Sequence, residues 1–263
     1  MNALDIGLWE LAAGYVLLIF PLAIMLWYRI DLIGTTLISV VRMTVQLLLV
    51  GLYLQFIFER NSVYLNTAWL LVMIAVADVS IARGCGLRLR RFYLPMFGSL
   101  IVGTAIPLLV FLGLILRRPN LMDAQYAIPI GGMILGNCLR ADIIAIRGFY
   151  ESIRDREKVF LHCLAQGARL HEATRPFMRD ACRAALTPTV ATMATIGLVS
   201  LPGMMTGVIL GGANPMTAIK YQIAIMISIF SGTAITIWMA INLSMKATFT
   251  HYGMLDPNIF SRK

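Results

Sequence analysis

Charged residues are scarce in this sequence. Asp, Glu, Lys and Arg make up 13% of the 263 residues, 59% are hydrophobic, and the mean hydropathy is +0.79. Soluble domains carry about 25% charged and about 45–50% apolar residues. A chain of this length cannot bury so much apolar surface in a water-soluble core. The composition therefore excludes an ordinary soluble domain and indicates a protein that lies in lipid.

Motifs for chemistry are also missing. The sequence contains no G-x-x-x-x-G-K-[ST] phosphate loop, no Gly-rich nucleotide fingerprint, no nucleophile elbow and no H-E-x-x-H motif. The four cysteines and three histidines show no metal-ligand spacing. We expect no enzyme and no cofactor on this chain. Where ATP drives its function, a partner subunit must bind the ATP.

The formal net charge of +9 does not indicate a nucleic-acid-binding protein, because the basic residues lie in loops between long apolar runs. Membrane lipid is the expected partner, and nucleic acid is not. The sixteen methionines are scattered, as is usual for Met in apolar helices. Soft-metal binding by particular methionines is an alternative, and the metal ligands are unknown.

Seven apolar runs are long enough to cross a bilayer as helices, which takes about 20 residues each. They cover about 8–28, 37–58, 67–83, 93–116, 126–147, 187–210 and 221–245. The runs are too long and too continuous for barrel strands. We predict an all-α polytopic membrane protein, with residues 1–263 forming one transmembrane domain. The first run is expected to be a retained span, since it is too long for a signal peptide.

Basic residues predict the orientation of the spans. Segment 82–93, segment 148–186 and the C-terminal tail are rich in Lys and Arg, and seven spans place all three on one side of the membrane. By the positive-inside rule that side is cytoplasmic, with the N-terminus outside and the C-terminus inside. An even number of spans would spoil this agreement.

The segment at about 148–186 is the one substantial region outside the apolar runs. Its apolar spacing predicts a helix that ends at Gly167, where a left-handed cap fits, and a later helix that begins at Pro176. A short helix is expected between them, at 168–175. Such a projection could transmit force from a soluble motor, or it could be a solvated loop with no partner. The candidate coupling residues are Glu157, Ala165, Gly167, Ala168, Arg169 and Glu172.

Polar residues interrupt several spans, and ionisable groups in a span mark a functional hypothesis. Arg42 and Gln46 lie four apart, so they share a helix face. The predicted orientation places Arg42, Asp78, Arg140 and Asp142 in the cytoplasmic half of the membrane. Two interpretations are open: an ion-paired cluster that fixes helix packing, or a substrate vestibule. The candidate translocation path comprises Arg42, Gln46, Asp78, Met133, Asn137, Asp142, Met204 and Met205.

The sixth apolar run is rich in glycine and contains a proline. Gly203, Gly207 and Gly211 repeat every four residues, which lets helices approach closely. Pro202 should break or kink the helix. The glycines thus indicate either helix packing or a broken helix at a transport site. The candidate gate residues are Pro188, Pro202, Gly203, Gly207 and Gly211.

Five stretches resemble the Fet-type iron-export permease family, to which plant aluminium-tolerance permeases also belong. They are G-L-V-S-L-P-G-M-M-T-G at 197–207, A-I-K-Y-Q-I at 218–223, I-P-I-G-G-M-I-L-G-N at 128–137, R-A-A-L-T-P-T at 183–189 and V-R-M-T-V-Q-L at 41–47. The resemblance implies a homodimeric permease of an ATP-binding-cassette transporter, paired with a cytosolic ATPase in the bacterial inner membrane. It further implies export of iron or a related metal or metal complex.

The expected mechanism is alternating access, in which the ATPase moves the 148–186 helices and these tilt the sixth span through Thr187 and Pro188. Two rivals predict other behaviour. An ion-coupled secondary carrier would use Asp78 or Asp142 and would need no ATPase. A membrane scaffold or sensor would transport nothing.

Overall fold

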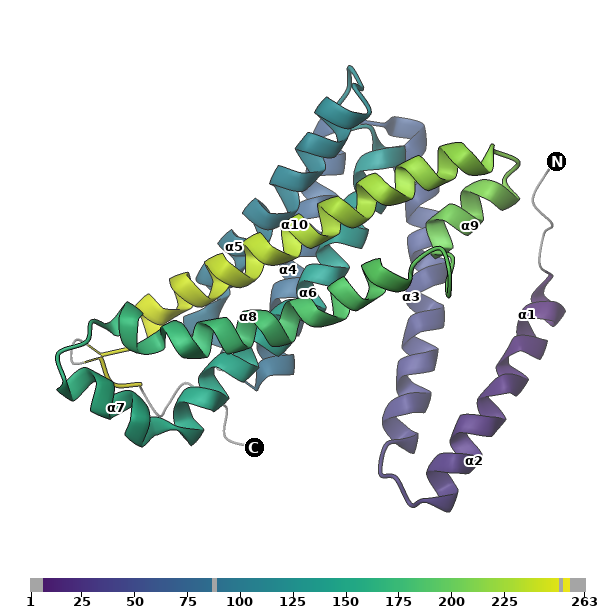
Figure 1. Cartoon of the computed structure of the whole chain (residues 1–263). Helices are drawn as coiled ribbons and strands as arrows, with labels where there is room; N and C mark the ends of the chain where they lie inside the picture. Colours follow the sequence, from purple (N-terminus) through teal and green to yellow (C-terminus); the bar gives the residue numbers. More distant parts are fainter. Residues whose placement is uncertain (1–6, 87–88, 251–252, 256–263) are drawn as a thin grey trace.

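The computed structural model describes residues 7–86, 89–250 and 253–255, and its regular structure is helical (Figure 1). Arg88, Arg262 and Lys263, which contribute to the predicted orientation, lie outside the described residues. The elements in chain order are α1 (Leu8–Tyr15), η1 (Val16–Leu18), α2 (Ile19–Trp27), α3 (Ile33–Arg60), α4 (Val63–Cys85), α5 (Leu89–Leu109), η2 (Val110–Ile115), α6 (Ala124–Asp155), α7 (Glu157–Ala165), α8 (Leu170–Thr195), α9 (Gly203–Leu210) and α10 (Pro215–Thr248).

Six helical rods in the described part of the chain are long and apolar enough to cross a membrane. They are Trp9–Trp27, Ile33–Arg60, Val63–Cys85, Phe92–Ile115, Ala124–Asp155 and Pro215–Thr248. The predicted all-α polytopic membrane fold is confirmed. Six of the seven predicted spans correspond to one of these rods each, and the remaining one, 187–210, does not form a continuous helix.

Helices α4, α5, α6 and α10 form the bundle that holds the core. In Figure 1, α4, α6 and α10 run in one direction and α5 runs in the other. The backbones of α5 and α10 touch where two glycines meet: a Cβ added to Gly232 would lie 2.7 Å from the Gly103 carbonyl oxygen. Glycine is required at this crossing because any side chain would force the helices apart.

The N-terminal helices stand apart from this bundle. The rod α1–η1–α2 and most of α3 extend away from it (Figure 1), and their most apolar 18-residue stretches bury nothing. Only the last turns of α3 pack on the bundle, where Ile57 is buried and the rings of Tyr53 and Trp69 lie 4.2 Å apart. The free apolar surface of these helices must be covered by lipid or by other protein.

The sixth predicted span, 187–210, is divided between two helices. The helix α8 ends at Thr195, residues 196–202 are irregular, and α9 begins at Gly203. The prediction of one helix over 187–210 is therefore wrong, although the interruption lies beside Pro202 as the sequence indicated. In Figure 1, α8, the irregular segment and α9 together run antiparallel to α10.

The predicted projection at 148–186 is present but divides differently. Helix α6 continues to Asp155, α7 ends before Gly167, whose φ is +90°, and α8 begins at Leu170. The prediction that Pro176 begins a helix is wrong. The Glu172 carboxylate accepts a hydrogen bond from the Arg169 backbone N–H at 2.7 Å, and this cap starts α8 six residues earlier.

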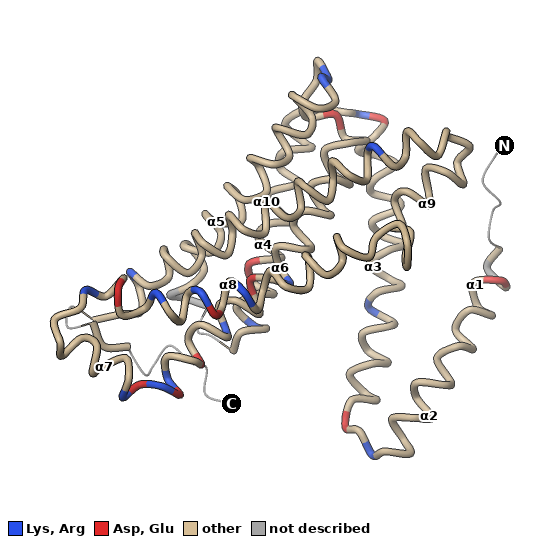
Figure 2. Tube along the Cα trace, viewed as in Figure 1, with Lys and Arg blue, Asp and Glu red and all other residues tan. Residues whose placement is uncertain are grey.

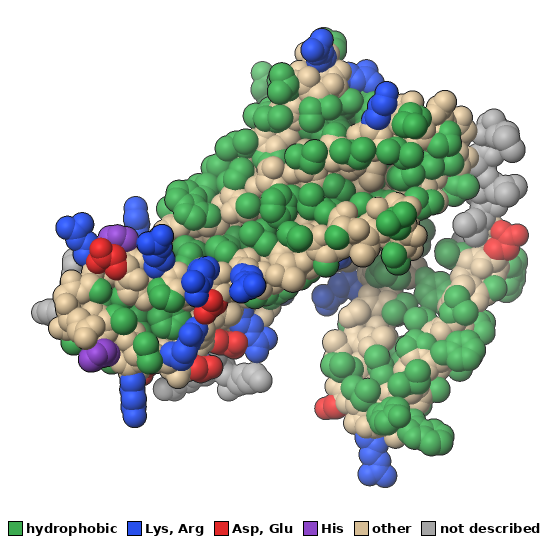
Figure 3. Space-filling model, in the orientation of Figure 1, with side chains coloured by type: hydrophobic (Ala, Val, Ile, Leu, Met, Phe, Trp, Pro, Cys, Tyr) green, Lys and Arg blue, Asp and Glu red, His purple; other side chains and the backbone are tan. Residues whose placement is uncertain are grey.

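Charge separates the two parts of the molecule. In Figure 2, Lys, Arg, Asp and Glu gather around α7 and the first half of α8. The visible surface over α5, α10 and the second half of α8 is mainly hydrophobic in Figure 3. Helix α6 has 32 residues and so spans about 48 Å, more than the roughly 30 Å of bilayer hydrocarbon. Its C-terminal turns therefore extend out of the membrane and carry α7.

Candidate translocation site

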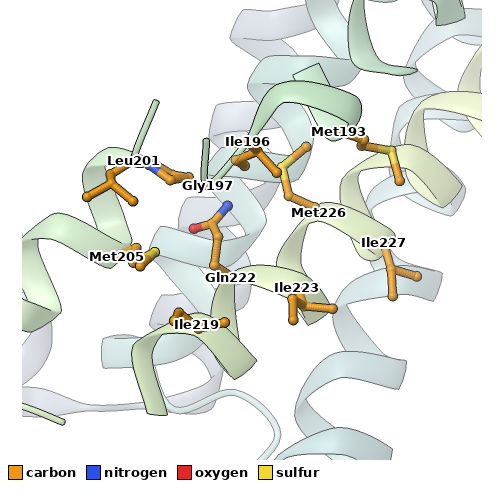
Figure 4. A pocket seen from close by; sticks show the side chains of 11 residues that line it. Met193, Ile196, Gly197, Leu201, Met205, Ile219, Gln222, Ile223, Met226 and Ile227 are labelled. Atoms are coloured by element: carbon orange, nitrogen blue, oxygen red, sulfur yellow. The ribbon is translucent and has the colours of Figure 1, made fainter. Parts of the chain in front are cut away.

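A cavity of about 560 Å³ lies where the broken helix faces α10. Figure 4 shows its lining side chains, which come from the end of α8, the irregular segment, α9 and α10. They are Met193, Ile196, Gly197, Leu201, Pro202, Met205, Ile219, Gln222, Ile223, Met226 and Ile227. All except Gln222 are apolar, so the cavity offers a hydrophobic space with one amide.

Local sequence explains why the helix breaks here. Gly197 has φ +88°, a conformation that glycine adopts without strain. The Gly197 backbone N–H donates to the Ser200 carbonyl oxygen at 2.9 Å, which closes a tight turn. Pro202 then stands before the first residue of α9, where its fixed φ suits a helix start. Three residues of this irregular segment, Gly197, Leu201 and Pro202, line the cavity.

A smaller cleft of about 200 Å³ lies between α6, α8 and α10. Its lining comprises Asn137, Arg140, Ala141, Ile144, Ala185, Pro188, Thr189, Thr192, Met226 and Ile229. Met226 borders both the cleft and the apolar cavity, so the two hollows adjoin at this side chain. The cleft differs from the cavity because its lining includes the Arg140 guanidinium and several hydrogen-bonding side chains.

The structure brings together only part of the predicted translocation path. Of its members, Met205 lines the cavity and Asn137 lines the cleft. Two of the predicted gate residues lie there as well, Pro202 at the cavity and Pro188 at the cleft. Met133 and Met204 are partly buried against the bundle core instead. The predicted path therefore does not form one site in the structure, and only Met205 and Asn137 lie at the two hollows beside the broken helix.

The predicted ion-paired cluster of Arg42, Asp78, Arg140 and Asp142 is wrong for the described residues. Asp78 and Asp142 are 0% and 1% exposed, and their carboxylate oxygens have no hydrogen-bond partner there. Arg42 and Gln46 lie on the exposed part of α3, away from the bundle. Asp142 lies near Thr236 on α10 and Cys138 on α6, so it belongs to the core between these helices.

The glycine stripe of α9 packs on no other element among the described residues. A Cβ at Gly203 or Gly207 would meet nothing within 4 Å, and one at Gly211 would meet only the backbone of its own helix. Close helix packing within this chain therefore does not explain these glycines, whereas Gly103 and Gly232 do form such a contact.

Most of the predicted coupling residues are exposed on the charged projection. Glu157, Ala165, Gly167, Arg169 and Glu172 are exposed, and Ala168 is partly buried against the core. A hollow of about 480 Å³ lies beside them, lined by Glu172, Arg175, Pro176 and Arg179. The charged projection therefore presents an exposed polar surface beside this hollow.

Aromatic contacts join the projection to the bundle. The ring of Phe160 on α7 lies 6.2 Å from that of Phe177 on α8 and 5.9 Å from that of Phe249 after α10. Arg156 stacks over Phe177 at 4.7 Å and pairs with Asp180 at 3.3 Å. These contacts pack α7 against α8 and against the residues that follow α10.

Sequence reasoning missed several residues that the structure places in the site. Gln222, Met193, Met226 and Gly197 all line the cavity. Gln222 could have been noticed as a single amide inside an apolar span. Met193 and Met226 could not be predicted, because nothing in the sequence shows that α8 and α10 face each other there.

Comparison with known proteins settles the family. The profile of the Uncharacterised protein family (UPF0014) matches residues 8–249. The chain belongs to this family. It is 31% identical over 263 residues to the Escherichia coli K12 protein named Probable iron export permease protein FetB, covering 100% of both chains.

Other relatives of this UPF0014 protein come from plants and cyanobacteria. It is 31% identical to Protein ALUMINUM SENSITIVE 3 of Arabidopsis thaliana over 97% of this chain and 92% of the relative. It is 34% identical to UPF0014 membrane protein slr1647 of Synechocystis over 84% of each. No solved structure matches the chain. The family names and the apolar helices agree that this is an integral membrane protein.

Proposed function

We propose that this chain is the permease subunit of an ATP-binding-cassette transporter, with ATP bound by a separate cytosolic subunit. The observation that carries the proposal is the broken helix α8–α9, which borders an open apolar cavity of about 560 Å³ beside α10. Interrupted helices at membrane depth are typical of substrate sites in transporters. The permease name of the Escherichia coli relative supports the same conclusion.

The proposed topology has seven crossings. Six are the continuous rods, and the seventh is α8, residues 196–202 and α9 together. This number places the charged projection on the cytoplasmic side, with the N-terminus outside and the C-terminus inside. Arg154, Arg156, Lys158 and Arg169 then lie on the side that the positive-inside rule favours. The membrane is proposed to be the bacterial cytoplasmic membrane.

The proposed mechanism uses α8 as a lever. An ATPase that docks on the exposed Glu157–Glu172 surface would move α7, and the Phe160–Phe177 contact would pass this motion to α8. Since α8 ends at the cavity wall, its displacement changes the cavity directly. The flexible joint lies at residues 196–202, between Thr195 and Gly203. Pro188 sits on the same lever, beside the smaller cleft.

A homodimer is part of the proposal. The uncovered apolar faces of α1–α3 and the open glycine stripe of α9 are surfaces on which a second copy could pack. By analogy with the Escherichia coli relative, the exported solute is iron or a related metal or metal complex. Among the described residues no cluster of three or more His, Cys, Asp or Glu could hold a metal ion.

Co-reconstitution with the ATPase subunit tests the proposal. Proteoliposomes that contain both chains should show ATP-dependent metal export, which Glu157→Arg should reduce by altering the docking surface. The matched control is Glu151→Gln, on the cytoplasmic part of α6, where Glu151 pairs with Arg147. Absence of ATPase binding, together with absence of transport, would reject the proposal and favour a scaffold or sensor.

An ion-coupled carrier is the second candidate, favoured by the two buried carboxyls without partners, Asp78 and Asp142. Charged groups in such surroundings are commonly parts of ion pathways. This candidate predicts transport by the lone chain in liposomes under an ion gradient. It also predicts that the Asp142→Asn variant loses that transport.

A further inference from the structure

The two adjoining hollows differ in chemistry in a way that fits one kind of ligand. The cleft presents Arg140, Asn137, Thr189 and Thr192, and the cavity beyond Met226 presents apolar side chains. A molecule that occupies both needs a polar end at Arg140 and an apolar portion past Met226.

Arg140 determines the charge of the polar end. No acidic side chain lines the cleft, and no ion pair of Arg140 occurs in the described part of the chain. Asp142 lies only two positions away but on another face of α6, because two residues turn a helix by about 200°. A guanidinium within a bilayer is costly unless an anion or water compensates it. The cleft is therefore complementary to an anionic group.

Size and polarity determine the apolar portion. Ligand cavities have volumes of about 300–1,000 Å³ and apolar walls with a few polar groups. The cavity of about 560 Å³ falls in this range, and its single amide, Gln222, is 8% exposed. The Gln222 side chain forms no hydrogen bond within the described residues, so it can bond to one neutral polar group of a ligand.

We propose that these hollows bind an anionic lipid, with its headgroup at Arg140 and an acyl chain in the Met226–Met205 cavity. Arg140 lies nearer the charged projection, and the cavity lies at the opposite end of α8. In the proposed topology this is the orientation of a lipid of the cytoplasmic leaflet. The site goes beyond the proposed function, and it rests on that proposal only for the topology that determines the leaflet.

Lipid retention by the purified chain tests this site without any ATPase, so its outcome is separate from that of the transport proposal. The full-length protein in mild detergent is mixed with phosphatidylglycerol or phosphatidylcholine of the same chains, and bound lipid is measured by native mass spectrometry. We expect phosphatidylglycerol to be retained about tenfold more than phosphatidylcholine, since only the former offers a net anion.

Four variants locate the binding. Arg140→Gln should lose the preference for phosphatidylglycerol, and Arg140→Lys should keep it because the charge remains. Arg147→Gln is the matched control on the same helix, since Arg147 pairs with Glu151 at 2.9 Å outside both hollows, and it should bind as the parent does. Met226→Trp should reduce retention of both lipids by filling the junction.

Several outcomes would overturn the proposal. Equal retention of the two lipids would contradict an anion site at Arg140. An unchanged preference for phosphatidylglycerol in Arg140→Gln would contradict it as well. Unchanged lipid retention in Met226→Trp would show that the acyl chain does not lie in the cavity. Displacement of phosphatidylglycerol by inorganic phosphate alone would replace the lipid with a free anion. Cross-linking between two copies through Ile223→Cys, with no lipid bound, would assign the cavity to a second copy of the chain.

Discussion

The ring of Phe160 on α7 meets the ring of Phe177 on α8 edge to face, with centroids 6.2 Å apart and an interplanar angle of 78°. Both side chains are buried although they belong to the charged projection. This contact is the joint between the proposed docking surface and the lever that reaches the cavity. Removal of this ring contact should therefore uncouple the docking surface from the cavity.

Phe160→Ala should uncouple the ATPase from transport. Loss of a buried Phe side chain costs about 3–5 kcal/mol in a packed site, so α7 would no longer be held firmly on α8. We expect ATP hydrolysis to persist while transport per ATP falls several-fold. Val159→Ala, at a neighbouring position that is 58% exposed, should leave the ratio unchanged. Equal ratios in the two variants would contradict the lever.

Gly232→Ala should destabilise the bundle. Its Cβ would lie 2.7 Å from the Gly103 carbonyl oxygen and 2.9 Å from Ile134, and the backbone oxygen cannot move aside without shifting α5. Overpacking of this kind costs about 1–3 kcal/mol. Thermal unfolding in detergent should show a lowered Tm. Gly98→Ala on α5, where a Cβ meets nothing within 4 Å, should keep the parental Tm. Similar values for both would argue against the close helix crossing.

Gly197→Ala should impair the irregular segment more than Gly203→Ala. Residue 197 has φ +88°, and left-handed backbone costs a residue with a Cβ about 1–2 kcal/mol. Gly203 begins α9 with open space around it, so a methyl group is harmless there. Transport and cavity binding should fall for Gly197→Ala alone. The reverse order would restore Gly203 as the critical glycine.

Asp78→Asn and Asp142→Asn should raise the Tm or leave it unchanged. The parental carboxyls are buried without hydrogen-bond partners among the described residues, so they contribute no bond that the amide would lose. If the carboxyls serve transport, the same variants should lose activity, the usual trade-off at functional sites. A clear drop in Tm for both would assign them a structural role.

The sequence was sufficient for features that depend on local pattern. Long apolar runs located six rods, and Pro202 with its neighbouring glycines located the interruption between α8 and α9. Gly167 marked the end of α7 because its left-handed backbone favours glycine. These features follow from hydropathy and backbone preference, which a sequence displays directly.

Features that depend on which faces meet were not accessible in the same way. The charges at positions 140 and 142 are adjacent in sequence, yet Arg140 faces the cleft beside α8 and Asp142 faces the core near Thr236. Arg42 was expected beside them, but α3 packs on the bundle only through its last turns, which follow Arg42 in the chain. The sequence predicts the depth of these residues in the membrane, but it does not show which helix face each side chain lies on. The predicted start of α8 at Pro176 was wrong because the helix begins earlier, at the cap formed by the Glu172 carboxylate and the Arg169 backbone N–H.

Chemical labelling of single cysteines on the two sides of the broken helix tests the account most directly. In a cysteine-free background, Glu157→Cys on α7 lies before the segment formed by α8, residues 196–202 and α9, and Asn214→Cys lies directly after it. A membrane-impermeant maleimide should label position 214 in intact cells, and position 157 only after permeabilisation. Labelling of both positions from the same side would show that this segment does not cross the membrane, and the proposed transport path would be lost with it.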